Sequence, residues 1–215
     1  MRLFNIIFGK KKTVTVVPPS EIIPLTATNW QPSPPIILTG GSTVFEAKPA
    51  PLMVPFTKDI SYLDPRMRKD IPEFLRIVED AGLELKLSCT ARLFKCQVAL
   101  YAQGRQPLAE VNRLRKLAGM QPILTAVEAK KKVTWTLVSK HLVNFDDTDP
   151  NNDYSQAFDF FLISKKKAYW DVKANVNNNQ IADYQEVGEI AESFGWEWGG
   201  RWKKKPDYPH IQLKA

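Results

Sequence analysis

The distribution of proline divides this sequence into two parts. Nine of the sixteen prolines lie within the first 55 residues. Proline fixes its own backbone dihedral and lacks an amide hydrogen, so proline-rich sequence favours extended conformations over packed helices. The same segment carries many apolar side chains, which a solvated linker would lack. We therefore expect residues 1–58 to form an extended arm, with a short strand at 13–17, that docks on a partner protein or packs on the rest of the chain.

Residues 59–215 have the periodicity of one compact domain. Four segments place apolar residues at helical spacing and end next to a glycine: 70–81, 93–103, 107–118 and 183–194. Asp70 is the expected N-cap of the first. Five segments have strand patterns: 83–88, 133–138, 157–163, 168–172 and 210–213. Helices and strands mix without a regular βαβ alternation, which predicts an α+β fold with a small antiparallel sheet flanked by helices.

The charge and cysteine content narrow the function classes. A formal net charge of +7 favours a polyanionic partner, and four lysine triplets (10–12, 130–132, 165–167 and 203–205) would steer the chain toward one. No apolar run is long enough for a membrane span. The apolar patch at the N-terminus precedes its lysines, the reverse of a secretory signal, so we expect no signal peptide. Cys89 and Cys96 form no CxxC pair and are expected to be reduced thiols.

The two histidines stand in chemically suggestive surroundings. His141 follows a predicted strand, and His210 begins the last one. Between them, Asp159 lies inside the apolar run 157–161, where a carboxylate is costly unless it is paired or binds a metal. Two imidazoles and one carboxylate, with a fourth position open, form a catalytic zinc site. Asp207 precedes His210 by three residues and would reach a water molecule at the same metal.

Three blocks of sequence resemble the M15 family of zinc peptidases. Ser139-Lys140-His141 with Ser155-Gln156-Ala157-Phe158-Asp159 is similar to the family's S-x-H and G-x-A-x-D motifs. The segment 195–202, followed by Asp207-Tyr208-Pro209-His210, resembles its W-G-G-x-W and D-x-x-H ending. The segment 89–105 resembles the family's R-x-x-x-x-Q and L-Y-x-Q-G-R block. The resemblance covers about residues 62–215 and is strongest to the phage endolysin branch.

The resemblance implies a role for each matching residue. His141, Asp159 and His210 would bind Zn²⁺, and Asp207 would be the catalytic base. Arg92 would hold substrate or the developing oxyanion, a common task for a fixed guanidinium. Gln97, Ser139, Trp198 and Trp202 are expected to bind substrate or support these groups.

Two departures from the family pattern leave alternatives open. Ser155 replaces the usual glycine, and 18 positions separate His141 from Asp159, which is more than usual. Asp146, Asp147 and Asp149 are therefore rivals of Asp159 as the carboxylate ligand, and Glu197 is an alternative proton carrier. The acidic loop 146–153 is also a candidate Ca²⁺ site, because its Asp and Asn oxygens suit a hard cation.

These observations predict a zinc-dependent peptidase that hydrolyses peptidoglycan stem peptides, as a phage-type endolysin or a virion-associated endopeptidase. It would be made in the host cytoplasm and reach the cell wall through a pore or in a virion. Two alternatives are a D,D-carboxypeptidase and a structural virion protein that retains the peptidase fold, docked to a phage structural protein through residues 1–58. A nucleic-acid-binding module is disfavoured, because it leaves the histidines and Asp159 unexplained.

Overall fold

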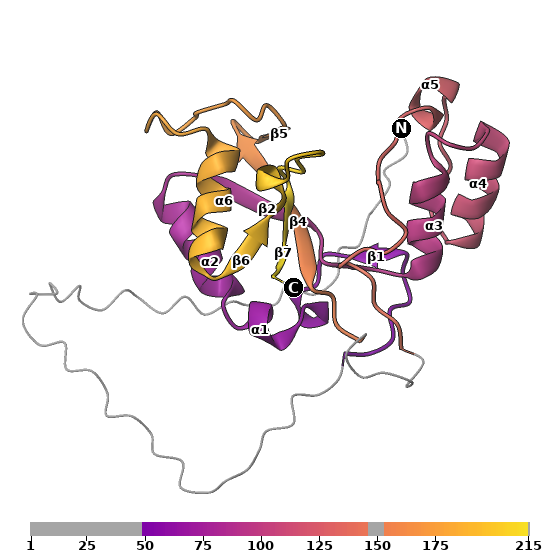
Figure 1. Ribbon diagram of the computed structural model, residues 1–215, viewed down its shortest axis with the longest axis horizontal. Helices are drawn as coiled ribbons and strands as arrows, with labels where there is room; N and C mark the ends of the chain where they lie inside the picture. Colours follow the sequence, from indigo (N-terminus) through magenta and orange to yellow (C-terminus); the bar gives the residue numbers. More distant parts are fainter. Residues whose placement is uncertain (1–48, 146–152, 215) are drawn as a thin grey trace, which may run out of the picture. The chain divides into compact units, whose positions relative to one another are not determined.

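The computed structural model describes residues 49–145 and 153–214 (Figure 1). The predicted strand at 13–17, most of the proline-rich arm and the acidic residues 146–152 lie outside these ranges. The predicted division into an arm (1–58) and a domain (59–215) therefore stays a prediction for most of the arm. No helix among the described residues is long and apolar enough to cross a membrane.

The described residues form an α+β fold, as the sequence predicts. The helices are η1 (Ile60–Tyr62), α1 (Pro65–Arg68), α2 (Ile71–Asp80), α3 (Phe94–Ala102), α4 (Leu108–Leu117), α5 (Ala126–Ala129), α6 (Asp183–Ser193) and η3 (Gly199–Arg201). The strands are β1 (Phe56–Thr57), β2 (Glu84–Cys89), β3 (Ala91–Arg92), β4 (Ala157–Ser164), β5 (Lys167–Tyr169), β6 (Trp196–Trp198) and β7 (His210–Leu213). The main sheet is antiparallel with the order β2-β4-β7-β6, and β5 also pairs with β4. Strands β1 and β3 form a separate antiparallel pair.

The central strand β4 separates the hydrophobic core from the polar site. Successive strand residues point to opposite faces of a sheet. Phe158, Phe160 and Leu162 are fully buried in the core, together with residues of α2 and α6. Figure 1 shows these two helices together beside the strands. Asp159 lies between two of these core residues, so its side chain points to the opposite face.

A second apolar cluster joins α3, α4 and α5 through Ala102, Val111, Ile123 and Ala129. Gly104, which follows α3, has a φ of +78°, a left-handed conformation that favours glycine. A Cβ atom at this position would lie 2.7 Å from the backbone nitrogen of Lys132. This close approach ties the start of the segment 132–141 to the end of α3.

Three local predictions differ from the structure. Residues 133–138 form no strand; Thr134 and Thr136 instead bond to the buried Gln97 side chain. That tertiary contact overrides their β-propensity. Asp70 precedes α2 but makes no side-chain capping bond. The predicted strand at 168–172 is the shorter β5.

The last residues assigned to the arm are part of the folded domain. Strand β1 pairs with β3, and the amide of Leu93 donates to the carbonyl of Pro55. Leu52 is buried in a small cluster with Ala91 and Val143. These contacts place residues 52–57 against the segments that carry Arg92 and His141.

Candidate active site

Four backbone segments bring the polar residues together. Asp159 on β4 is paired with His210 on β7 and with Cys89 on β2. A register shift between Leu87 and Cys89 places Cys89 opposite Asp159. His141 lies in a turn, and its own backbone carbonyl oxygen accepts a hydrogen bond from the amide of Arg92. The sheet register and this turn therefore fix all three predicted ligands.

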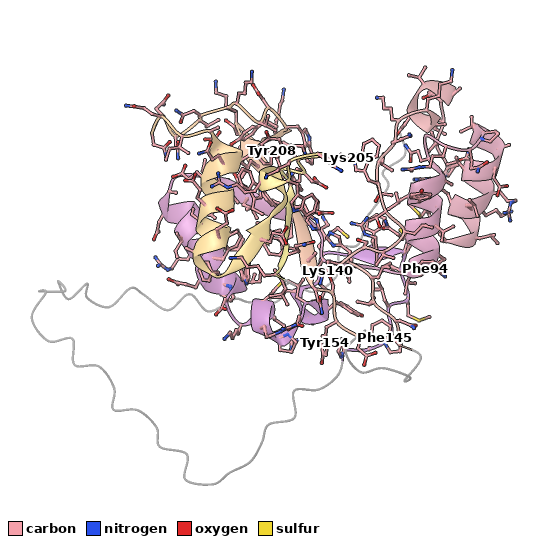
Figure 2. The ribbon with its side chains drawn as sticks, viewed as in Figure 1. Phe94, Lys140, Phe145, Tyr154, Lys205 and Tyr208 are labelled. Carbon is pink, nitrogen blue, oxygen red and sulfur yellow. The ribbon has the colours of Figure 1, made fainter. Side chains whose placement is uncertain are left out.

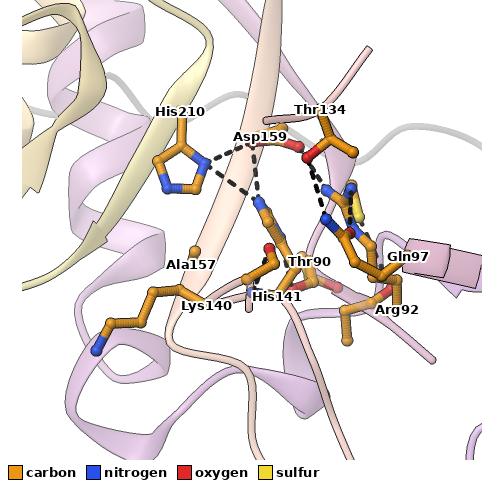
Figure 3. A network of polar contacts seen from close by, with 12 residues as sticks. Thr90, Arg92, Gln97, Thr134, Lys140, His141, Ala157, Asp159 and His210 are labelled. Atoms are coloured by element: carbon orange, nitrogen blue, oxygen red, sulfur yellow. Dashed lines mark hydrogen bonds and ion pairs between the residues drawn. The ribbon is translucent and has the colours of Figure 1, made fainter. Parts of the chain in front are cut away.

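The three predicted metal ligands converge on one point (Figure 3). His141 Nε2 lies 3.0 Å from Asp159 Oδ1 and 3.2 Å from His210 Nδ1. His210 Nδ1 lies 2.9 Å from the same carboxylate oxygen. Ligand atoms arranged tetrahedrally around zinc at its usual bond lengths are about 3.3 Å apart. The three donors are thus within a few tenths of an ångström of the spacing that zinc requires.

The outer partners of the two histidines fix which ring nitrogens carry lone pairs. His141 Nδ1 faces the carbonyl oxygen of Thr90 at 3.3 Å, and a carbonyl only accepts. His210 Nε2 faces Gln212 Oε1 at 3.1 Å, and the amide nitrogen of Gln212 donates to Glu197. Each outer ring nitrogen therefore carries the proton. The inner nitrogens present lone pairs to each other and to Asp159, an arrangement that a bound cation relieves.

The electrostatics of this cluster keep Asp159 ionised. Burial opposes its charge, but the interactions with His141 and His210 outweigh it and hold the pKa of Asp159 well below its usual range. Burial lowers the pKa of His141, which is only 2% exposed and stays neutral. Burial opposes the charge of His210, yet the adjacent carboxylate of Asp159 raises its pKa. Zinc binds an ionised carboxylate and neutral imidazoles, so the states of Asp159 and His141 suit it, and zinc binding would release a proton that His210 carries.

Cys89 is a fourth donor near the cluster. Its sulfur lies within 4.8 Å of the ligand atoms of His141 and Asp159. Burial raises the pKa of the Cys89 thiol to about 12, and the thiol donates to the carbonyl of Ala91. His210 lies closer than Cys89 to His141 and Asp159, and its Nδ1 already presents a lone pair. The geometry therefore favours the two histidines and Asp159 as the ligand set.

Asp207 lies in the tight turn that leads into β7. Its amide donates to the carbonyl of Gly199, and the amide of His210 donates to the carbonyl of Asp207. A Cβ atom at Gly199 would lie 2.5 Å from that carbonyl oxygen and 3.2 Å from the Cβ of His210, so only glycine allows this packing. Asp207 is exposed to the cleft, and partial desolvation together with the nearby charge of Asp159 raises its pKa. A carboxylate with a raised pKa is suited to exchange protons.

Arg92 is held against Asp159 by its guanidinium group. Its Nη2 donates to Asp159 Oδ2 at 3.0 Å, and its Nη1 contacts Gln97 Oε1 at 3.4 Å. Its Nε is buried without a hydrogen-bond partner among the described residues. The guanidinium therefore orients the carboxylate through its Nη atoms.

The predicted residues surround a cleft of about 410 Å³. Its lining includes Arg92, Ser139, His141, Asp159, Trp202, Asp207 and His210. Ser139 acts as a turn residue, because its hydroxyl accepts from the amide of His141. Trp202 lies beside His210 and donates to Glu197.

Two predicted site residues support the cleft from behind. Gln97 is fully buried and joins Arg92 to the segment 134–136. Trp198 is buried against Gly188 and Gly200, and its indole nitrogen donates to the carbonyl of Tyr208. Trp198 thus supports the 207–210 turn and does not line the cleft, so of its two predicted roles the supporting one fits its position.

The rival ligands and the calcium site cannot be placed. Asp146, Asp147 and Asp149 lie outside the described residues, as does most of the candidate Ca²⁺ loop 146–153. Only Asp153 of this loop is described, and it is buried. No observation supports calcium, and Asp159 is the carboxylate that the structure brings to both histidines.

The sequence interpretation missed one group that touches the cluster, Gln212, and gave its partner Glu197 another role. Gln212 holds the outer nitrogen of His210, and Glu197 holds Gln212. Gln212 follows His210 by two residues in the same strand, so strand periodicity already placed both on one face. Glu197 accepts hydrogen bonds from Gln212 and Trp202, so it holds these two side chains in place rather than carrying a proton.

An α+β domain with two histidines, a carboxylate and a nearby acidic residue in one cleft defines a metal-dependent hydrolase. The comparisons with known proteins identify the family. A family model described as D-alanyl-D-alanine carboxypeptidase, of the M15 peptidases, matches residues 151–213. The chain is 43% identical over 154 residues to the peptidoglycan L-alanyl-D-glutamate endopeptidase CwlK of Bacillus subtilis (strain 168), covering 71% of this chain and 74% of that protein. The chain belongs to the M15 peptidase family, whose members are zinc-dependent.

A solved structure is also similar. The L-Ala D-Glu endopeptidase ChiX of Serratia marcescens matches with a TM-score of 0.39 and 17% identity. The match covers 73% of this chain and 84% of that one.

Proposed function

We propose that this protein is a zinc-dependent endopeptidase that hydrolyses the bond between L-alanine and D-glutamate in peptidoglycan stem peptides. The observation that carries the proposal is the convergence of His141 Nε2, Asp159 Oδ1 and His210 Nδ1 within 3.2 Å of one another. The substrate is proposed from the similarity to CwlK, which is named for that bond.

The residues of the cleft divide the chemistry among them. Zinc held by the three ligands supplies Lewis-acid polarisation of the scissile carbonyl and activation of water. Asp207 accepts the proton of the attacking water and transfers it to the leaving amine of D-glutamate, and its raised pKa favours that exchange. Arg92 fixes Asp159 and lines the cleft, so its positive charge stabilises the oxygen on which negative charge develops.

A second candidate function is a D,D-carboxypeptidase, because the matching family model carries that description. Both activities use the same metal and base and differ in how the peptide lies in the cleft. The phage or virion setting, the release through a pore and a docking role for residues 1–58 are further proposals that rest on the sequence alone.

The test is hydrolysis by the purified, zinc-loaded protein. Two synthetic stem peptides, one with an L-Ala–D-Glu bond and one ending in D-Ala–D-Ala, are incubated separately and the products are identified by mass spectrometry. We expect cleavage only between L-alanine and D-glutamate. Release of terminal D-alanine alone would support the carboxypeptidase instead. Hydrolysis of neither bond by protein with stoichiometric zinc would refute both and leave a structural role.

A further inference from the structure

The entrance of the cleft has a different chemistry from its floor. The segment 132–141 lines one side of the cleft, and Trp202, Pro206 and Asp207 line another. Lys132 and Trp135 belong to the first side. Lys205 precedes Pro206 and contacts Trp135, and we name these three residues the cleft mouth. Figure 2 shows Lys205 extending away from the strands of the main sheet.

One aromatic ring gathers two positive charges at the cleft mouth. The ammonium group of Lys205 lies 3.9 Å from the ring centroid of Trp135, and that of Lys132 lies 5.7 Å from it. Trp135 is 52% exposed. Cation–π contacts are weak at exposed sites, and two ammonium groups near one ring repel each other. The arrangement would be stabilised by an anion bound between them.

Neither lysine has a carboxylate partner within the described part of the chain, residues 49–145 and 153–214. The cleft has two acidic side chains, Asp159 on β4 and Asp207 in the turn before β7, and neither forms an ion pair with these lysines. Asp159 is already bonded to Arg92, His141 and His210. Both charges of the cleft mouth therefore remain available to a ligand.

The residues on both sides of Trp135 are held in place by buried contacts. Gln97, which is fully buried, donates from Nε2 to Thr134 Oγ1 at 3.0 Å and to the carbonyl of Thr136 at 2.6 Å. Arg105 Nη2 donates to the carbonyl of Thr134 at 3.1 Å. The two residues that flank Trp135 are thus anchored to α3 and the residues just after it. A solvated lysine-rich loop would need no such anchor.

We propose that Lys132, Trp135 and Lys205 form a subsite that binds a free carboxylate of the peptide substrate. The inference rests on the proposed function, because an L-Ala–D-Glu substrate supplies this group. Glutamate has two carboxyl groups, and only one of them continues the chain. Positive charge at the mouth and negative charge on the floor would align such a peptide with its carboxylate outward.

The test compares two matched L-Ala–D-Glu peptides, one with its carboxylates free and one with all of them converted to amides. The ratio of kcat/KM for the acid to that for the amide is measured for the wild type, Lys205→Gln, Trp135→Leu and the double variant Lys132→Gln/Lys205→Gln. We expect the wild type to prefer the acid, and the ratio to fall about threefold to tenfold in the double variant, mainly through KM. The control, Lys167→Gln, changes one lysine of another triplet, at the start of β5, and should leave the ratio unchanged.

Each outcome decides the proposal. No preference for the acid in the wild type, an unchanged ratio in the double variant, or an equal fall in Lys167→Gln would overturn it. If the wild type cleaves neither peptide, the proposed function fails, and titration calorimetry with the acid peptide tests the subsite separately. Weaker binding by the double variant than by Lys167→Gln would then support the subsite, and equal or absent binding would overturn it.

Discussion

The floor and the mouth of the cleft are built in opposite ways. On the floor, His141, Asp159 and His210 are held by sheet register and by partners on their outer sides. At the mouth, Lys132 and Lys205 are exposed and meet only at the ring of Trp135. A buried polar group loses far more when its partner is removed than an exposed one does. Changes on the floor should therefore abolish function, and changes at the mouth should adjust it.

The largest effect is expected from His210→Ala, which removes one ligand. The remaining His141 and Asp159 form an incomplete site, so zinc and peptidase activity should both be lost. Elemental analysis of the purified variant measures the metal, and a thermal melt confirms that it is folded. Stoichiometric zinc in this variant would show that His210 is not a ligand. Lys167→Gln is the matched control.

Asp207→Asn should separate proton transfer from metal binding. Asparagine keeps the shape of the side chain but cannot accept the proton of water, so turnover should fall about 10²–10⁴-fold while zinc is retained. Asp171→Asn, on an exposed loop, is the control. Loss of zinc in Asp207→Asn, with retention in Asp159→Asn, would exchange the two assigned roles.

Gln212→Leu tests how strongly the outer hydrogen-bond partner of His210 contributes to metal binding on the floor of the cleft. Without the amide oxygen, the ring of His210 loses the contact that fixes its protonated nitrogen. Removing such a partner weakens metal affinity about 10–100-fold. Competition with a chelator measures the affinity. Gln185→Leu removes an exposed helix contact to Glu189 and should change nothing. Unaltered affinity in Gln212→Leu would show that sheet register alone orients His210.

The difference between floor and mouth also explains what the sequence could predict. A carboxylate at Asp159, inside an apolar strand pattern, predicts that it is paired or binds a metal, and the structure pairs it with Arg92, His141 and His210. His210 meets Asp159 through two predicted strands, whereas His141 reaches it from a turn, because the strand predicted before it does not form. The helices that end at Gly104 and Gly119 were likewise predictable from local pattern.

The mouth could not be predicted in the same way. Residues 133–138 alternate like a strand, yet their conformation is set by Gln97, which is distant in sequence. The contact between Trp135 and Lys205 depends on two loops whose meeting no periodicity encodes. Trp198 likewise packs against Gly188, a contact that the motif alone does not specify.

The smallest effect is expected from Thr134→Val, which tests the link between the two regions. Valine keeps the volume of threonine and removes the hydroxyl that accepts from Gln97. One such hydrogen bond contributes about 0.5–1.5 kcal/mol, so kcat/KM should fall about twofold to tenfold as the segment carrying Trp135 loosens. Thr134→Ser keeps the hydroxyl and should behave like the wild type. Zinc content should be unchanged in both variants, because Gln97 contacts Arg92 rather than a ligand. A loss of zinc in Thr134→Val would mean that the mouth helps to hold the floor, and the two regions would then have to be treated as one unit.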